Sequence, residues 1–191
     1  MLLTVQEQYH KVWKLIFAGG ILNVIIGLGI FFPVFRPDTL RMLTGVMILL
    51  SAVVVAGTFW GGGRTMNPEV GILQFLTHLI AAGVILASPL GLDLPFIPVL
   101  AVYFGVLGAL AIREASRFRD SKSLFVPHLV MGITSFAFCL LALVVLARDT
   151  QYALVSTLAA LAFLIRGAAL IRIALVVRQS KPRKLPPDTA G

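Results

Sequence analysis

Long uncharged stretches dominate this chain and restrict its fold more than any other feature. Five blocks of apolar residues run for 19 to 25 residues without a single charge. A helix needs about 20 apolar residues to cross a hydrocarbon core of roughly 30 Å. The blocks are residues 15–35, 42–63, 70–92, 94–112 and 123–147. Each of them is therefore long enough to form a membrane-spanning helix.

A sixth apolar block follows, but an arginine interrupts it. Residues 150–165 are uncharged, Arg166 comes next, and apolar residues resume as far as Val177. We interpret residues 151–177 as one span that carries an internal arginine.

The composition supports helices in lipid rather than a water-soluble fold. Of the 191 residues, 59% are hydrophobic and 13% are charged, whereas soluble domains average about 25% charged residues. Lipid offers no partner for backbone N–H and C=O groups, so a spanning segment must be a helix or part of a barrel. A barrel would need roughly ten-residue strands of alternating polarity, and these blocks are continuously apolar. The predicted fold class is all-α, a polytopic membrane protein with six transmembrane helices.

The basic residues predict the orientation of this bundle. Eleven lysines and arginines fall in the two terminal segments and the two connections on the same side, against three on the other side. Cytoplasmic segments carry the excess of lysine and arginine. We expect a cytoplasmic segment at 1–14, a six-helix transmembrane domain at 15–177, and a basic, disordered cytoplasmic tail at 178–191. The basic residues lie between apolar runs, so we expect a lipid bilayer as partner and no nucleic acid.

Short outer turns suggest that the six spans form three hairpins. One aspartate marks each outer turn, at intervals of 55 and 56 residues, and a glycine recurs in each returning helix at intervals of 60 and 62 residues. The aspartates are Asp38, Asp93 and Asp149, and the glycines are Gly45, Gly105 and Gly167. A fixed period of this kind is typical of a repeated two-helix unit. Two small-residue patterns, Gly83-x-x-x-Ala87 and Ala101-x-x-x-Gly105, favour close helix packing.

Several short stretches resemble the HdeD family of small bacterial inner-membrane proteins. The resemblance covers about residues 12–174. It rests on Gly27-Leu-Gly-Ile-Phe-Phe-Pro33 with Asp38-Thr-Leu, on Ala87-Ser-Pro89-Leu-Gly91, on Gly105-Val-Leu-Gly-Ala-Leu-Ala-Ile-Arg113, on Met131-Gly-Ile and on Ser156-Thr-Leu. The resemblance implies a six-span, non-enzymatic protein of the bacterial inner membrane that contributes to acid or general stress tolerance. It supplies no set of functional residues.

Two other functions stay open beside that expectation. The first is a small channel or transporter for a proton or small solute. The second is a membrane scaffold subunit, acting through its helix faces and basic loops on a second copy or on another membrane protein. A transporter should show polar residues converging on one cavity, and a scaffold should show none.

Three polar residues, Asn23, His78 and Arg166, lie within different apolar blocks. Asn23 and His78 each follow the nearest charge on the predicted cytoplasmic side by nine residues, and Arg166 precedes the next two arginines by six and twelve. At 1.5 Å per residue, these intervals correspond to depths of about 13 Å and roughly 9–18 Å. The three side chains could share one layer and form a buried site for a proton or small ligand. The alternative, which we favour from the sequence, is hydrogen bonding between helices with an arginine that extends to the interface.

The outer aspartates also allow two interpretations. Asp38, Asp93 and Asp149 could act as acid sensors, because free carboxylates take up protons at acidic pH. Each also comes just before an expected helix, where a carboxylate can cap unpaired N–H groups. We favour the capping role.

No motif predicts catalysis, a metal or a cofactor. The order of residues in Gly61-Gly-Gly-Arg64 does not match a phosphate-binding loop, and neither H-E-x-x-H nor G-x-S-x-G occurs. Cys139 is the only cysteine, so an internal disulfide is excluded. A haem would need two histidines at compatible depth, and the sequence offers only His10, His78 and His128. We therefore expect a non-enzymatic protein without cofactors.

Overall fold

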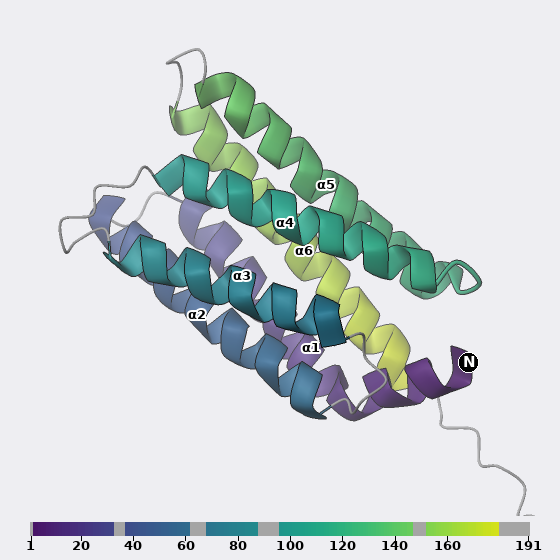
Figure 1. Cartoon of the computed structure of the whole chain (residues 1–191). Helices are drawn as coiled ribbons and strands as arrows, with labels where there is room; N and C mark the ends of the chain where they lie inside the picture. Colours follow the sequence, from purple (N-terminus) through teal and green to yellow (C-terminus); the bar gives the residue numbers. More distant parts are fainter. Residues whose placement is uncertain (1, 33–36, 62–67, 88–95, 147–151, 180–191) are drawn as a thin grey trace, which may run out of the picture.

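Six long helices make up a computed structural model, which describes residues 2–32, 37–61, 68–87, 96–146 and 152–179 (Figure 1). The helices are α1 (Leu2–Phe31), α2 (Pro37–Gly61), α3 (Pro68–Ala87), α4 (Phe96–Arg117), α5 (Lys122–Leu146) and α6 (Tyr152–Gln179). No strand occurs in the described ranges. The predicted all-α fold class is confirmed.

Each helix is long and apolar enough to cross a membrane, with candidate spans of 20 to 26 residues. Large apolar side chains cover the outside of the bundle: Val53 is 63% exposed and Ile80 and Val102 are each 64% exposed. A contiguous apolar surface of this kind is unfavourable in water, and it suits lipid. The helix α1 starts at Leu2, well before the expected span at residue 15, and its candidate span starts at His10.

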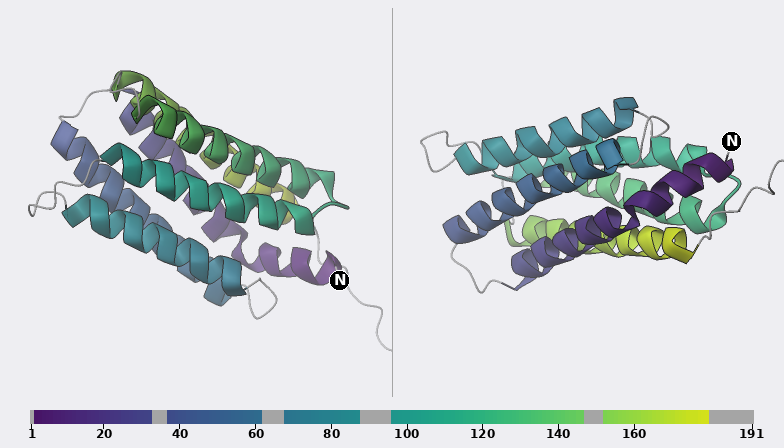
Figure 2. Two further views of the ribbon diagram at one scale, coloured as in Figure 1. Left: turned by 45° about the horizontal axis from the view of Figure 1, so that its top comes forward. Right: turned by 90° about the horizontal axis from the view of Figure 1, so that it is seen from below.

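The helices follow one another around a closed ring in chain order, and α6 returns to lie beside α1 (Figures 1 and 2). The most extensive contacts join α6 to α1, α4 to α5, and α2 to α3. The predicted hairpins would instead pair α1 with α2, α3 with α4 and α5 with α6. Those pairs are neighbours in the ring but pack less closely, so the hairpin arrangement is not confirmed.

Glycines explain why the closest helix pairs differ from the predicted hairpins. The three recurring glycines all face the helix that follows in the ring: Gly45 meets Leu86 of α3, Gly105 meets Cys139 of α5, and Gly167 meets Gly20 of α1. Small residues let helix backbones approach closely in lipid, where van der Waals packing drives association. The recurring glycines therefore mark the contacts of α2 with α3, α4 with α5 and α6 with α1. The expectation for Gly83 is wrong, because a Cβ there would meet nothing within 4 Å.

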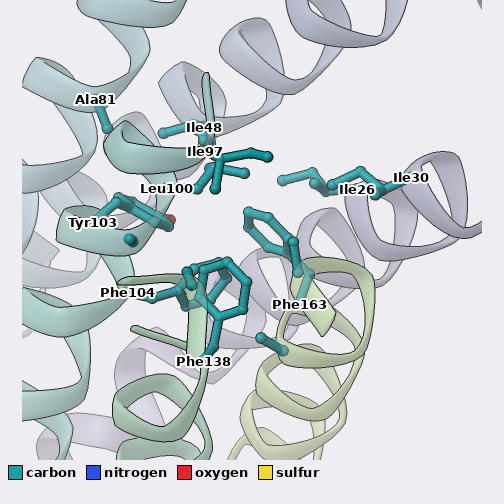
Figure 3. Close-up of a cluster of buried hydrophobic side chains, with 14 of the residues drawn as sticks. Ile26, Ile30, Ile48, Ala81, Ile97, Leu100, Tyr103, Phe104, Phe138 and Phe163 are labelled. Atoms are coloured by element: carbon teal, nitrogen blue, oxygen red, sulfur yellow. The ribbon is translucent and has the colours of Figure 1, made fainter. Parts of the chain in front are cut away.

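The buried apolar residues form one large cluster, one smaller cluster at one end of the bundle, and a group of three, Ala111, Met131 and Ala169. We call the end that carries Lys11, Arg117, Lys122 and Arg178 the basic end. In the middle of the bundle lies an aromatic cluster, in which Phe104 contacts Phe138 and Phe163 at ring-centroid distances of 4.9 and 4.7 Å (Figure 3). A smaller group closes the basic end: Val12, Ile16, Phe118, Leu124, Ile173, Ala174 and Val177.

Candidate functional site

A cavity of about 120 Å³ lies in the half of the bundle nearer the basic end, and all six helices contribute to its lining, which is mainly apolar but includes several polar residues. Its polar lining residues are Asn23, Ser51, Thr58, Gln74, His78, Glu114, His128 and Arg166. A buried water needs roughly 10–15 Å³ of such space and two to four polar partners. The cavity is therefore both large enough and polar enough to hold several waters or one small solute.

The three residues of the predicted polar layer all line this cavity. Asn23 comes from α1, His78 from α3 and Arg166 from α6. Each is at least 96% buried. The depth argument from the sequence thus identified three side chains that the fold brings to one place. Whether that place is a functional site stays a prediction.

Arg166 is buried without the partners that a buried charge requires. Its side chain lines the cavity, the residue is only 4% exposed, and its Nε and Nη1 atoms have no hydrogen-bond partner. We expected the side chain of Arg166 to extend to the bundle surface, but it stays inside the bundle. The neighbouring Gly167 packs against α1. Successive residues of a helix point about 100° apart, so Arg166 points away from that contact. Close packing at Gly167 thereby turns Arg166 toward the bundle interior.

Asn23 lines the cavity from α1, and only the nitrogen of its side-chain amide is hydrogen-bonded. Its Nδ2 donates to the carbonyl oxygen of Gly19 at 2.7 Å, four residues earlier. Its Oδ1 is buried and has no partner. A polar group left unpaired in a protein interior costs about 1–3 kcal/mol. Two of the three residues predicted from the sequence therefore line the same cavity and carry buried polar atoms without a partner.

Two histidines in the lining have the same local geometry. The Nδ1 atoms of His78 and His128 each lie 2.7 Å from the carbonyl oxygen four residues earlier, that of Gln74 and Leu124 respectively. A carbonyl can only accept, so Nδ1 carries the proton and Nε2 remains for other partners. His78 meets the edge of Tyr103, and His128 stacks on Phe118. Aromatic contacts thus fix both rings at the cavity wall.

Glu114 contributes a carboxylate to the cavity lining near the basic end. Its Oε1 lies 3.3 Å from Nη1 of Arg117, one turn later on α4. A second ion pair, between Arg113 and Glu69 at 2.7 Å, joins α4 to α3 on the surface. Of these two pairs, only the one that includes Glu114 reaches the cavity lining.

The outer aspartates lie away from the cavity or outside the described residues. Asp38 is exposed in the first turn of α2, which begins at Pro37, so it follows the first helical residue instead of preceding the helix. A negative charge there still stabilises the helix through its dipole. Asp93 and Asp149 lie outside the described residues. The sensor and capping interpretations both stay predictions.

The sequence analysis missed His128, Ser51 and Glu114 as cavity residues. His128 lies six residues after Lys122, which places it about 9 Å along α5 by the depth argument that selected His78. That signal was available in the sequence. His10 is separate from the cavity, with its Nδ1 3.0 Å from the carbonyl oxygen of Val177. Within the described ranges, no group of three or more His, Cys, Asp or Glu residues could hold a metal ion.

A scan against models of protein families, a search of curated proteins and a search of solved structures each found no match to this chain. The functional argument therefore rests on the cavity and its residues.

Proposed function

We propose that this protein binds a small polar solute within the membrane and acts as a small channel or transporter. The observation that supports this proposal is the convergence of polar side chains from all six helices on one cavity, inside a bundle whose core is mostly apolar. Polar and ionisable groups at membrane depth are costly, and they commonly mark solute pathways. A scaffold would need no such cavity.

The aromatic cluster is the barrier between the cavity and the far end of the bundle. Phe104, Phe138 and Phe163 are each at most 3% exposed and fill the space between α4, α5 and α6 (Figure 3). In this arrangement the cavity and the far end are separated. Passage of a solute would therefore require these rings to move.

Solute flux across a vesicle membrane tests the proposal. Purified protein in proteoliposomes should raise the permeability to small polar solutes, measured by stopped-flow light scattering. Ser51→Leu would fill the cavity and should abolish the increase. Ser156→Leu, at an exposed position on α6, is the matched control and should not. Permeability equal to that of empty vesicles, together with no solute binding by calorimetry, would overturn the proposal.

Orientation and location form the second part of the proposal. The excess of lysine and arginine at the basic end favours a bacterial inner membrane with both termini in the cytoplasm. The cavity would then lie in the cytoplasmic half of the bilayer. Reporter fusions at each terminus test this, since a periplasmic reporter active at either end would contradict it.

Acid or general stress tolerance is a second candidate for the physiological role. The resemblance to the HdeD family supports it, and so does the pair of histidines in the cavity wall, because histidine changes charge between neutral and acidic pH. A bacterium lacking the gene should survive acid less well, and His78→Ala should fail to restore survival. Full restoration by a double His78→Ala, Arg166→Leu variant would remove any link between the cavity and stress.

A further inference from the structure

We propose that the cavity is a binding site for a small monovalent anion, held by the guanidinium group of Arg166. This inference rests on the proposed function and names the class of solute. Three properties of the site support it: an unpaired buried charge, the size of the cavity, and the positions of the other polar groups.

The charge of Arg166 calls for an anionic partner. An arginine stays protonated in proteins, and an isolated charge in a protein interior is strongly unfavourable unless it is paired. The Nε and Nη1 atoms of Arg166 are buried and have no protein partner. The carboxylate of Glu114 shares the lining but is ion-paired with Arg117 at 3.3 Å. An anion in the cavity would supply a counter-charge for this guanidinium, two of whose three nitrogens have no partner.

The size of the cavity limits which anions can bind. At roughly 10–15 Å³ of such space per water, a volume of about 120 Å³ holds several waters. Halides and anions of about four heavy atoms, such as nitrate, bicarbonate and acetate, fit within that space. A single arginine balances one negative charge, so a divalent anion would carry an uncompensated charge into the interior.

The other polar groups leave Arg166 as the principal donor. The Nδ2 of Asn23 donates to the Gly19 carbonyl oxygen, and the hydroxyl of Ser51 donates to the Met47 carbonyl oxygen at 3.0 Å. The Ser51 hydroxyl therefore has no hydrogen left to donate, and Asn23 keeps one neutral N–H donor, so Arg166 is the cationic donor of the lining. A guanidinium has a planar fork of donors that matches two oxygens of a planar oxyanion. We therefore expect nitrate, bicarbonate and acetate to bind more tightly than chloride.

Thermal unfolding of the purified full chain in lipid nanodiscs tests this. Sodium nitrate, acetate or chloride would be titrated at constant ionic strength against sodium gluconate, an anion too large for the cavity. A ligand that binds only the folded state raises Tm in a saturable way. We expect saturable rises with nitrate and acetate, a smaller one with chloride, and none with gluconate.

Two variants of α6 localise the effect. Arg166→Gln should weaken nitrate binding about tenfold or more, because a charged hydrogen-bond donor is lost. Arg172→Gln removes an exposed arginine six residues later on the same helix and should leave binding unchanged. If Arg166→Gln does not fold, Arg166→Lys replaces it in the test. Lysine keeps the positive charge but lacks the planar set of guanidinium donors, so this variant should lower the affinity for nitrate more than the affinity for chloride.

Three results would overturn the inference: no saturable shift in the wild type, equal shifts with gluconate, or equal loss of binding in the two glutamine variants. The failure of this inference is distinguishable from the failure of the proposed function. Flux or binding of a neutral solute, blocked by Ser51→Leu, would leave the proposed function standing while the anion assignment fell.

Discussion

Gly20 of α1 and Gly167 of α6 face each other so closely that neither position has room for a side chain. A Cβ on Gly20 would lie 3.0 Å from the carbonyl oxygen of Gly167, and a Cβ on Gly167 would lie 2.8 Å from the carbonyl oxygen of Gly20. These residues are 147 positions apart in the chain. Their contact closes the ring of helices and directs Arg166 into the cavity.

Gly167→Ala should destabilise the bundle, because its Cβ would meet backbone atoms that cannot rotate away. Overpacking of a close contact typically costs about 1–3 kcal/mol. Unfolding in mixed micelles of increasing SDS fraction would measure the loss. Gly83→Ala is the control: a Cβ there meets nothing within 4 Å, and alanine favours a helix over glycine by roughly 0.5–1 kcal/mol. Equal stability of the two variants would show that α1 and α6 are not in close contact.

Phe104→Ala should cost about 3–5 kcal/mol, because it removes the ring that touches both Phe138 and Phe163 and leaves a void in the aromatic cluster. Phe32→Ala removes the same side chain at a site that is 55% exposed and should change stability little. The same SDS titration measures both. If the aromatic cluster is also the barrier, Phe104→Ala should raise solute flux in vesicles that still contain folded protein. Unchanged flux would assign the barrier to other residues.

Arg166→Met should keep the fold and raise its stability by about 1–3 kcal/mol. An unpaired buried polar group costs about that amount, and an apolar replacement of similar shape removes the cost. A structural role would give the opposite result, since loss of a hydrogen-bonding hub destabilises a bundle. A stable variant that has lost anion binding would show that Arg166 is retained for the ligand. A Met variant less stable than wild type would argue for a structural arginine.

The ion pair between Glu69 and Arg113 should contribute little despite its 2.7 Å distance. The two side chains are 68% and 51% exposed, and exposed pairs contribute about 0–1 kcal/mol. Glu69→Gln should therefore change the free energy of unfolding by less than about 1 kcal/mol. A larger loss would mean that α3 and α4, which share the least extensive contact in the ring, depend on this bridge.

Hydrophobic patterning was sufficient to predict the six apolar helices and to select three residues that line one cavity. Both depend only on distance along a helix, which the sequence contains directly: Asn23 and His78 follow their nearest charges by equal intervals. The recurrence of Gly45, Gly105 and Gly167 also corresponds to structure, since each of them contacts the next helix in the ring, whereas the repeated two-helix unit stays a prediction.

The sequence could not predict which helices pair most closely. Pairing depends on which face each helix turns toward its neighbour, and a short outer turn favours adjacency without determining the extent of contact. Gly20 could be matched to Gly167 only once the ring was known to close. For the same reason Ser51 and Glu114 were missed, because their position in the lining depends on the rotation of α2 and α4 about their axes.

Accessibility of the bundle interior to water tests the central claim most directly. In a Cys139→Ala background, a cysteine would replace either Ser51, which lines the cavity, or Val53, which is 63% exposed on the outside of α2. A cysteine forms thiolate more readily in contact with water than in lipid, and thiolate is the form that binds metal ions. In lipid vesicles, Ag⁺ should therefore protect Ser51→Cys from later labelling by a thiol dye under denaturing conditions, and should not protect Val53→Cys. Folded protein in which Ag⁺ protects neither cysteine would mean a dry interior and would contradict the account.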